Sequence, residues 1–114
     1  MRGFFARRIC ELGQGRRSVL FICYLNWTDQ GARAVKGVAT RHENLKPEIA
    51  RLGGRLIGGY VTKGQYDVVL VLEMPDDDAM TKLAVGLASR GHVRTTTARA
   101  YLPEEFGRLA AEVP

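Results

Sequence analysis

The spacing of apolar residues changes along the chain, from continuous runs in some segments to a repeat of three or four residues in others. Four runs are rich in apolar or β-branched residues and are bounded by polar residues or glycine, which indicates strands. The strands are predicted at 19–25, 55–62, 66–73 and 92–102. The first and third runs are the most continuously apolar. We therefore expect these two strands to be buried on both faces.

Between and after the strands, apolar residues recur every three or four positions, which indicates helices. The helices are predicted at about 28–38, 44–52, 76–90 and from 103 onward. Thr28 and Asn44 are suited to cap the first two, with the polar residues 40–44 forming a loop between them. That start places Pro47 at the third helical position, where its missing N–H costs no hydrogen bond.

The order strand, helix, strand, strand, helix, strand, helix predicts an α+β fold. It is the ferredoxin-like β-α-β-β-α-β sandwich, with the first and third strands central and an added C-terminal helix. Gly58 and Gly59 inside the second strand predict either a bulge or a place where another group packs against the backbone.

Two helices can cover only one face of such a sheet. The other face carries about half of the apolar side chains of the central strands, such as Val69 and Val71. An exposed apolar face of this size is typical of an association surface. We therefore predict a homodimer that packs sheet against sheet, unless the C-terminal helix already covers this face.

The charge is distributed unevenly along the 114 residues. Residues 1–18 carry five arginines against Glu11, whereas residues 19–114 carry twelve Lys/Arg against eleven Asp/Glu, so the body has a net charge of only +1. This distribution argues against a basic groove for nucleic acid. We predict an unstructured extension at 1–18 and a single domain at 19–114, a transit peptide or a basic arm for an acidic partner being the alternatives. No apolar core follows the arginines, so a secretory signal is excluded.

Cysteine and histidine are too sparse to predict a metal site. Cys10 and Cys23 form no C-x-x-C motif, and His42 lies 50 residues from His92. Cys23 is expected to behave as a small buried hydrophobe, and the pattern suits a reducing cytoplasm. No phosphate loop or dinucleotide fingerprint occurs, so no cofactor is predicted. No apolar run approaches the ~20 residues of a membrane span.

Several separated motifs together resemble the GYD domain family over residues 19–109. They are Leu25–Gly31 (LNWTDQG), Leu52–Gly54 (LGG), Thr62–Asp67 (TKGQYD), Pro75–Asp77 (PDD) and Val93–Thr97 (VRTTT). The resemblance implies a small prokaryotic domain with a ferredoxin-like or dimeric α/β-barrel fold. It implies no particular reaction.

Polar and aromatic residues near strand ends are the candidate ligand-binding groups. Gln65, Tyr66 and Asp67 at the hairpin could bind a small polar ligand. Alternatively, Gly64 supplies a positive φ for the turn and Asp67 bonds to backbone or to an arginine.

Asn26 and Trp27 end the first strand, where they could floor a pocket, although Trp27 could equally pack beneath a helix. Arg94 could hold an anion or form a cross-strand ion pair. His42 could carry a proton or be a solvated loop residue, and His92 is expected at the surface.

Three functions are open. The first is a dimeric small-molecule-binding or interaction module without chemistry of its own. The second is a small cofactor-independent enzyme, an oxygenase or isomerase, with Tyr60, Tyr66, Asp67, His42 and Arg94 lining a pocket between helices and sheet. The third, a nucleic-acid binder, requires aromatic and basic residues on central strands that are here mainly aliphatic.

Overall fold

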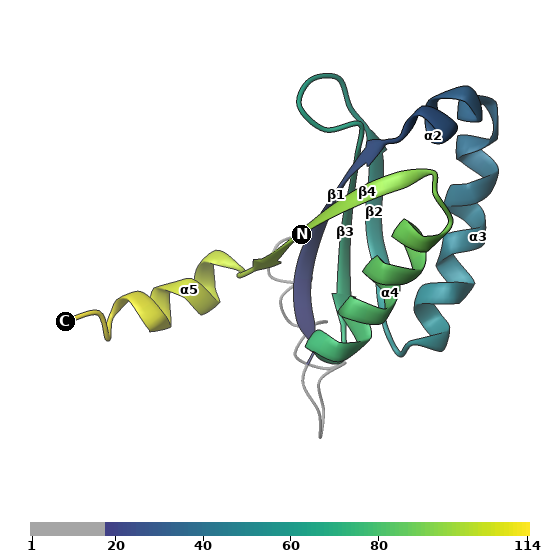
Figure 1. Ribbon diagram of the computed structural model, residues 1–114. Coiled ribbons are helices and arrows are strands. Elements are labelled where there is room, and N and C mark those ends of the chain that lie inside the picture. Colours follow the sequence, from purple (N-terminus) through teal and green to yellow (C-terminus); the bar gives the residue numbers. More distant parts are fainter. Residues whose placement is uncertain (1–17) are drawn as a thin grey trace.

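The computed structural model describes residues 18–114, so the predicted extension at 1–18 lies almost wholly outside the described residues. Figure 1 labels the elements in chain order. They are β1 (Val19–Trp27), α2 (Asp29–Arg33), a 3₁₀ turn η1 (Val35–Gly37), α3 (Val38–Arg51), β2 (Arg55–Val61), β3 (Val68–Met74), α4 (Asp77–Ser89), β4 (Val93–Ala100) and α5 (Pro103–Ala110).

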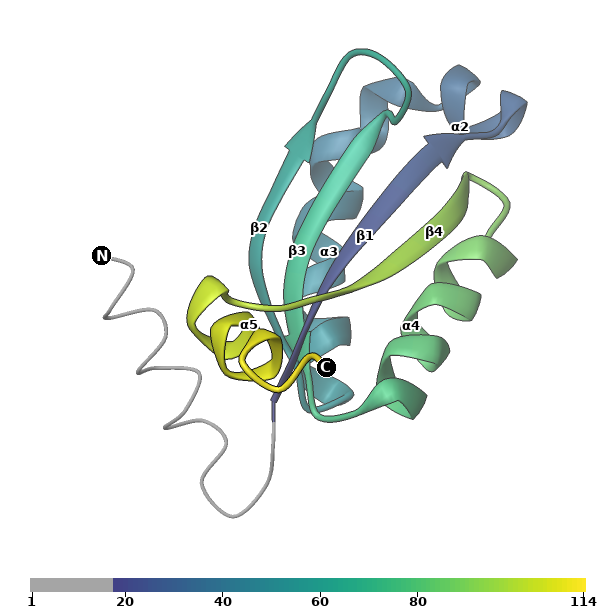
Figure 2. The ribbon, with the colours of Figure 1, turned by 90° about the vertical axis from the view of Figure 1, so that its left-hand side faces the viewer.

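The four strands form one antiparallel sheet in the order β2-β3-β1-β4. The first and third strands are therefore central, and the predicted α+β, ferredoxin-like fold is confirmed. Helices α3 and α4 both lie on one face of the sheet (Figures 1 and 2). Residues 18–114 contain no helix with the length and hydropathy needed to cross a bilayer.

The core lies between the sheet and these two helices. Alternate residues of β1 and β3 face it, because successive side chains of a strand point to opposite faces. The buried hydrophobic residues are Phe21, Cys23, Leu25, Leu45, Ile49, Val68, Leu70, Leu72, Met74, Ala79, Met80 and Leu83. Cys23 is fully buried, as predicted, and burial raises the pKa of its thiol.

The opposite face of the sheet carries the side chains of β1 and β3 that point away from the core. Its apolar residues are Leu20, Ile22 and Tyr24 of β1 and Val69 and Val71 of β3, all half-buried. We call this set the open sheet face. Within the described part of the chain, no helix lies flat on it (Figures 1 and 2).

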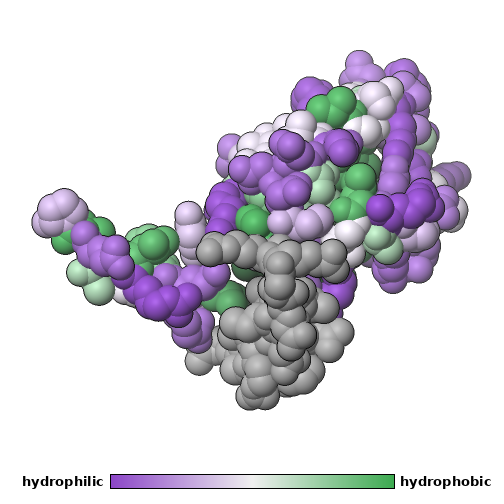
Figure 3. All heavy atoms as spheres, turned by 90° about the horizontal axis from the view of Figure 1, so that it is seen from below, coloured by the Kyte–Doolittle hydropathy of each residue, from purple (hydrophilic) through white to green (hydrophobic). Residues whose placement is uncertain are grey.

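Helix α5 leaves the body of the molecule instead of covering the open sheet face (Figure 1). Pro103 occupies its first turn, and the Glu105 carboxylate accepts a hydrogen bond from the Leu102 N–H at 3.0 Å. No residue of α5 is buried, and Phe106 and Leu109 are about half exposed, at 54% and 49%. Figure 3 shows hydrophobic patches beside hydrophilic ones on the segment that extends from the body of the molecule.

The first crossover differs from its prediction. The polar residues 40–44 are not a loop, because α3 runs unbroken from Val38 to Arg51. Asn44 is therefore not its cap, and Pro47 lies in the helix interior. The missing Pro47 N–H leaves the Glu43 carbonyl without its helical donor, but both residues are exposed, so water can bond that oxygen.

Other predicted boundaries hold more closely. The Thr28 hydroxyl caps α2 by accepting from the Gly31 N–H at 3.1 Å, although α2 ends at Arg33 and a 3₁₀ turn follows. The Asp76 carboxylate caps α4 by accepting from the Ala79 N–H at 2.8 Å. The predicted bulge in β2 is confirmed, since the pairing with β3 shifts register between Leu56 and Gly58.

Candidate functional site: a pocket between the helices and the sheet

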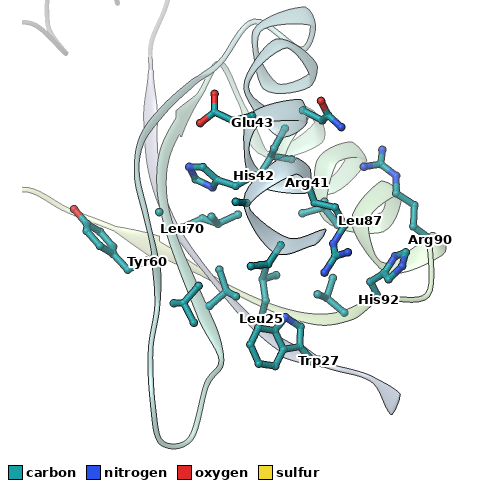
Figure 4. A pocket seen from close by; sticks show the side chains of 18 of the residues that line it. Leu25, Trp27, Arg41, His42, Glu43, Tyr60, Leu70, Leu87, Arg90 and His92 are labelled. Carbon is teal, nitrogen blue, oxygen red and sulfur yellow. The ribbon is translucent and has the colours of Figure 1, made fainter. Parts of the chain in front are cut away.

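A cavity of about 630 Å³ opens between α3, the sheet and the C-terminal end of α4 (Figure 4). Its apolar wall comes from both central strands and from α4, as illustrated by Leu25, Leu70 and Leu87. Polar groups enter mainly from α3 and from the start of β4. This volume lies in the range of small-molecule sites, roughly 300–1,000 Å³.

Arg41 of α3 is one of the charged residues that line this pocket (Figure 4). One guanidinium nitrogen, Nη1, donates to the Ala34 carbonyl at 3.0 Å, which fixes the side chain in place. The other, Nη2, is buried and has no hydrogen-bond partner among residues 18–114. No carboxylate of those residues lies within ion-pair distance of Arg41. A buried guanidinium nitrogen without a partner is costly, so a rotation of the side chain that brings Nη2 to an acceptor in the pocket would be favourable.

His42 follows Arg41 on α3 and packs against the backbone of β2. A Cβ at Gly59 would lie 2.4 Å from His42 Cε1 and 3.1 Å from Leu70 Cδ2. The glycine therefore provides the space that the imidazole occupies, which confirms the close approach predicted from the paired glycines. His42 lines the pocket, and it lies on a helix rather than in a solvated loop.

The mouth of the pocket carries an ion pair between α3 and the residue that follows α4. Arg90 donates through both terminal nitrogens to the two carboxylate oxygens of Glu48, with Nη1 3.0 Å from Oε1. This bidentate pair lowers the pKa of Glu48 from its ordinary value of 4.5, chiefly through the hydrogen bond from Arg90. The pair joins the two helices that cover the sheet.

The start of β4 is held against α2. The His92 carbonyl accepts from the Thr28 N–H at 3.1 Å, and the Thr28 hydroxyl donates to the Gly91 carbonyl. A side chain at Gly31 would collide with the His92 carbonyl oxygen, so a glycine is required there. His92 is half-buried and lines the pocket.

The hairpin residues form a second cluster that anchors the β2–β3 loop to the end of β1. Asn26 Nδ2 donates to the Gln65 carbonyl at 2.8 Å. The Asp67 carboxylate accepts from the Trp27 N–H at 2.9 Å. Tyr66 stacks on Tyr24 with ring centroids 4.5 Å apart. These contacts give the hairpin end a structural role.

The predicted candidates are thus divided between two places. Trp27, His42 and Tyr60 line the pocket, although the Tyr60 ring points away from it (Figure 4). Asn26, Gln65, Tyr66 and Asp67 lie at the hairpin end. Arg94 is exposed on β4, paired with Asn26 in the sheet register. The pocket residues that the sequence reasoning missed are Arg41, Glu48, Arg90 and His92.

Neither place resembles a metal centre. Among the described residues, no group of three or more His, Cys, Asp and Glu side chains is arranged to hold a metal ion. The pocket offers instead the guanidinium of Arg41, the Arg90–Glu48 ion pair, two imidazoles and apolar walls, which suits an organic ligand.

Comparison with known proteins identifies the family. The model of the GYD domain matches residues 21–110. The "Glutamine synthetase and cystathionine beta-lyase binding protein" of Thermus thermophilus is 35% identical over 81 residues, which cover 70% of this chain and 85% of that protein. No solved structure matches the chain. The sequence motifs, the ferredoxin-like sheet and these matches agree: the chain belongs to the GYD domain family.

Proposed function

We propose that this protein is a dimeric interaction module that binds other proteins and performs no chemistry of its own. The observation that carries the proposal is the open sheet face, which displays apolar side chains on both central strands that α3 and α4 do not cover. Such a face is stabilised by association. A second copy supplies an identical face, and a two-fold axis brings the two sheets together.

The oligomeric state tests this proposal through a matched pair of variants. Val71→Lys places a charge in the centre of the open sheet face, whereas Val85→Lys makes the same change on α4, where Val85 is 61% exposed. Light scattering after size exclusion should give a dimer for wild type and Val85→Lys, and a monomer for Val71→Lys. Circular dichroism melts confirm that each variant folds. A wild-type monomer at micromolar concentration contradicts the proposal.

The partner is proposed from the relative in Thermus thermophilus, whose name describes it as binding glutamine synthetase and cystathionine beta-lyase. We propose that this chain also binds a metabolic enzyme, with these two as the first candidates. Biolayer interferometry with the two purified enzymes from the organism that encodes this chain should detect at least one complex. Absence of binding to both enzymes contradicts this assignment. The buried free thiol of Cys23 suits action in a reducing cytoplasm.

A second candidate function is a cofactor-independent isomerase, because His42 and His92 both line the pocket. An imidazole there could take a proton from a carbon acid and return it. The test is exchange of the C3 protons of 4-methyl-2-oxopentanoate with deuterium oxide, followed by NMR. Exchange faster than in buffer, and lost in His42→Gln, supports the isomerase. Exchange no faster than in buffer removes this reason for proposing it.

A further inference from the structure

We propose that the pocket binds a small organic carboxylate with an apolar body, and that Arg41 holds the carboxylate. Nothing in this inference depends on the proposed dimer or protein partner. The first argument is the state of the guanidinium: Nη1 is tied to the Ala34 carbonyl at 3.0 Å, while Nη2 is buried and unpaired within residues 18–114.

The second argument is the balance of charge around the pocket. Among its carboxylates, Glu48 is engaged by Arg90 at the mouth, and Glu43 pairs with Lys46 at 3.1 Å on the exposed side of α3. Both acidic groups are therefore occupied elsewhere, and Arg41 is left without a counter-ion in the described structure. An anionic ligand supplies that charge, because a carboxylate matches the planar donor pattern of a guanidinium.

The third argument is the character of the remaining walls. Leu25, Val68 and Leu70 of the central strands line the pocket, together with Leu87 of α4 and Val93 of β4. These side chains offer no donors for the several oxygens of a phosphate group, although the imidazoles of His42 and His92 also line the pocket. A single guanidinium without a counter-ion in the described structure, beside an aliphatic wall, favours a monocarboxylate whose carbon chain displaces water from that wall.

The experiment uses the one tryptophan of the chain, Trp27, as a reporter, because it lines the same pocket. Fluorescence of the full chain is titrated with 4-methylpentanoate, 4-methylpentanamide and 3-methylbutyl phosphate, each to about 10 mM. We expect saturable binding of the carboxylate and a Kd at least about tenfold higher for the neutral amide.

Two substitutions assign the contact. Arg41→Gln should raise the Kd for 4-methylpentanoate by at least about tenfold. Arg41→Lys keeps the charge but loses the planar donors, so its Kd should lie between those of wild type and Arg41→Gln. Arg94→Gln removes the same charge from β4, outside the pocket, and should leave the Kd unchanged. Circular dichroism melts establish that each variant is folded.

Several results would overturn the inference. These are equal affinity for the acid and the amide, an unchanged Kd in Arg41→Gln, tighter binding of the phosphate ester than of the carboxylate, or no fluorescence change with any probe. The change in Trp27 fluorescence on ligand binding is measured on the purified chain alone. It therefore reports binding whether or not the chain forms the proposed dimer or the proposed enzyme complex.

Discussion

The imidazole of His42 occupies the space above Gly59 that any other residue would fill with its side chain. A Cβ at this position would lie 2.4 Å from Cε1 and 3.0 Å from Nδ1 of the ring. One wall of the pocket therefore depends on a glycine in β2 and on a residue of α3 that is 17 positions earlier in the chain. The pairing accounts for a glycine inside a strand, where it is otherwise unfavourable.

Gly59→Ala should destabilise the fold by about 1–3 kcal/mol, because the added methyl group forces His42 and Leu70 to move. Denaturant unfolding measures the change. In His42→Ala the same substitution should cost much less, and the double-mutant cycle reads the coupling directly. Gly107→Ala on α5, where nothing lies within 4 Å, serves as the control and should be neutral or stabilising. Equal costs of Gly59→Ala in both backgrounds would contradict the packing described.

The ion pair of Glu48 with Arg90 predicts an acid-sensitive contribution to stability. Its hydrogen bond and charge lower the folded-state pKa of Glu48, so the contribution is present above the ordinary pKa of 4.5 and is lost as pH falls through the lowered value. Glu48→Gln should therefore flatten the fall in stability below about pH 4.5, measured by urea unfolding at several pH values.

Glu43→Gln is the matched control for Glu48. It removes a carboxylate from the same helix, but the partner of Glu43 is Lys46, three residues later, and both side chains are largely exposed. The free energy of unfolding of Glu43→Gln should fall below about pH 4.5 as steeply as that of wild type. If the two variants show the same pH dependence, the cross-helix pair contributes nothing specific.

Cys23 should resist alkylation in the folded protein. It is fully buried, and burial raises the pKa of its thiol, so little thiolate is available and reagents cannot reach it. Iodoacetamide labelling at pH 8 followed by peptide mass spectrometry should show Cys23 modified only after addition of denaturant. Rapid labelling without denaturant would show that β1 opens readily.

Deleting residues 103–114 tests the role of α5. No residue of this helix is buried, so its removal should leave the thermal midpoint of the fold nearly unchanged. Its exposed Phe106 and Leu109 would add apolar contact area at the border of the proposed sheet-against-sheet dimer. The truncated chain should therefore dissociate at higher concentration than the full chain in sedimentation velocity. A large drop in the thermal midpoint would show that α5 stabilises its own subunit.

The sheet was predictable from sequence because its strands bury continuous apolar runs. Residues 19–25 and 66–73 indicate the central strands β1 and β3, and Asp76 indicates the start of α4 through its capping position. The first crossover was not predictable in the same way. Residues 40–44 are polar enough to indicate a loop, yet they belong to α3, whose outer side faces water.

That error also explains which pocket residues were missed. A loop gives no reason to direct Arg41 and His42 to the same cavity, whereas a helix beginning at Val38 does. Arg90 and Glu48 are far apart in the chain and meet only through the packing of α3 beside α4. The candidates at the hairpin were found because Gly64, with φ of 123°, and its neighbours form a local sequence motif.

Trp27 belongs to both clusters at once, since Asp67 of the hairpin holds its backbone while its ring lines the pocket. Leu25, which also lines the pocket, accepts a hydrogen bond from the Asp67 N–H at 2.9 Å, so the β2–β3 loop and the pocket are connected through the end of β1. A protein that binds this loop and displaces Asp67 would shift the pocket wall, and a molecule lodged beneath the indole would in turn alter how the loop is presented. Recognition at the surface and occupancy of the interior would then be coupled through the last residues of β1.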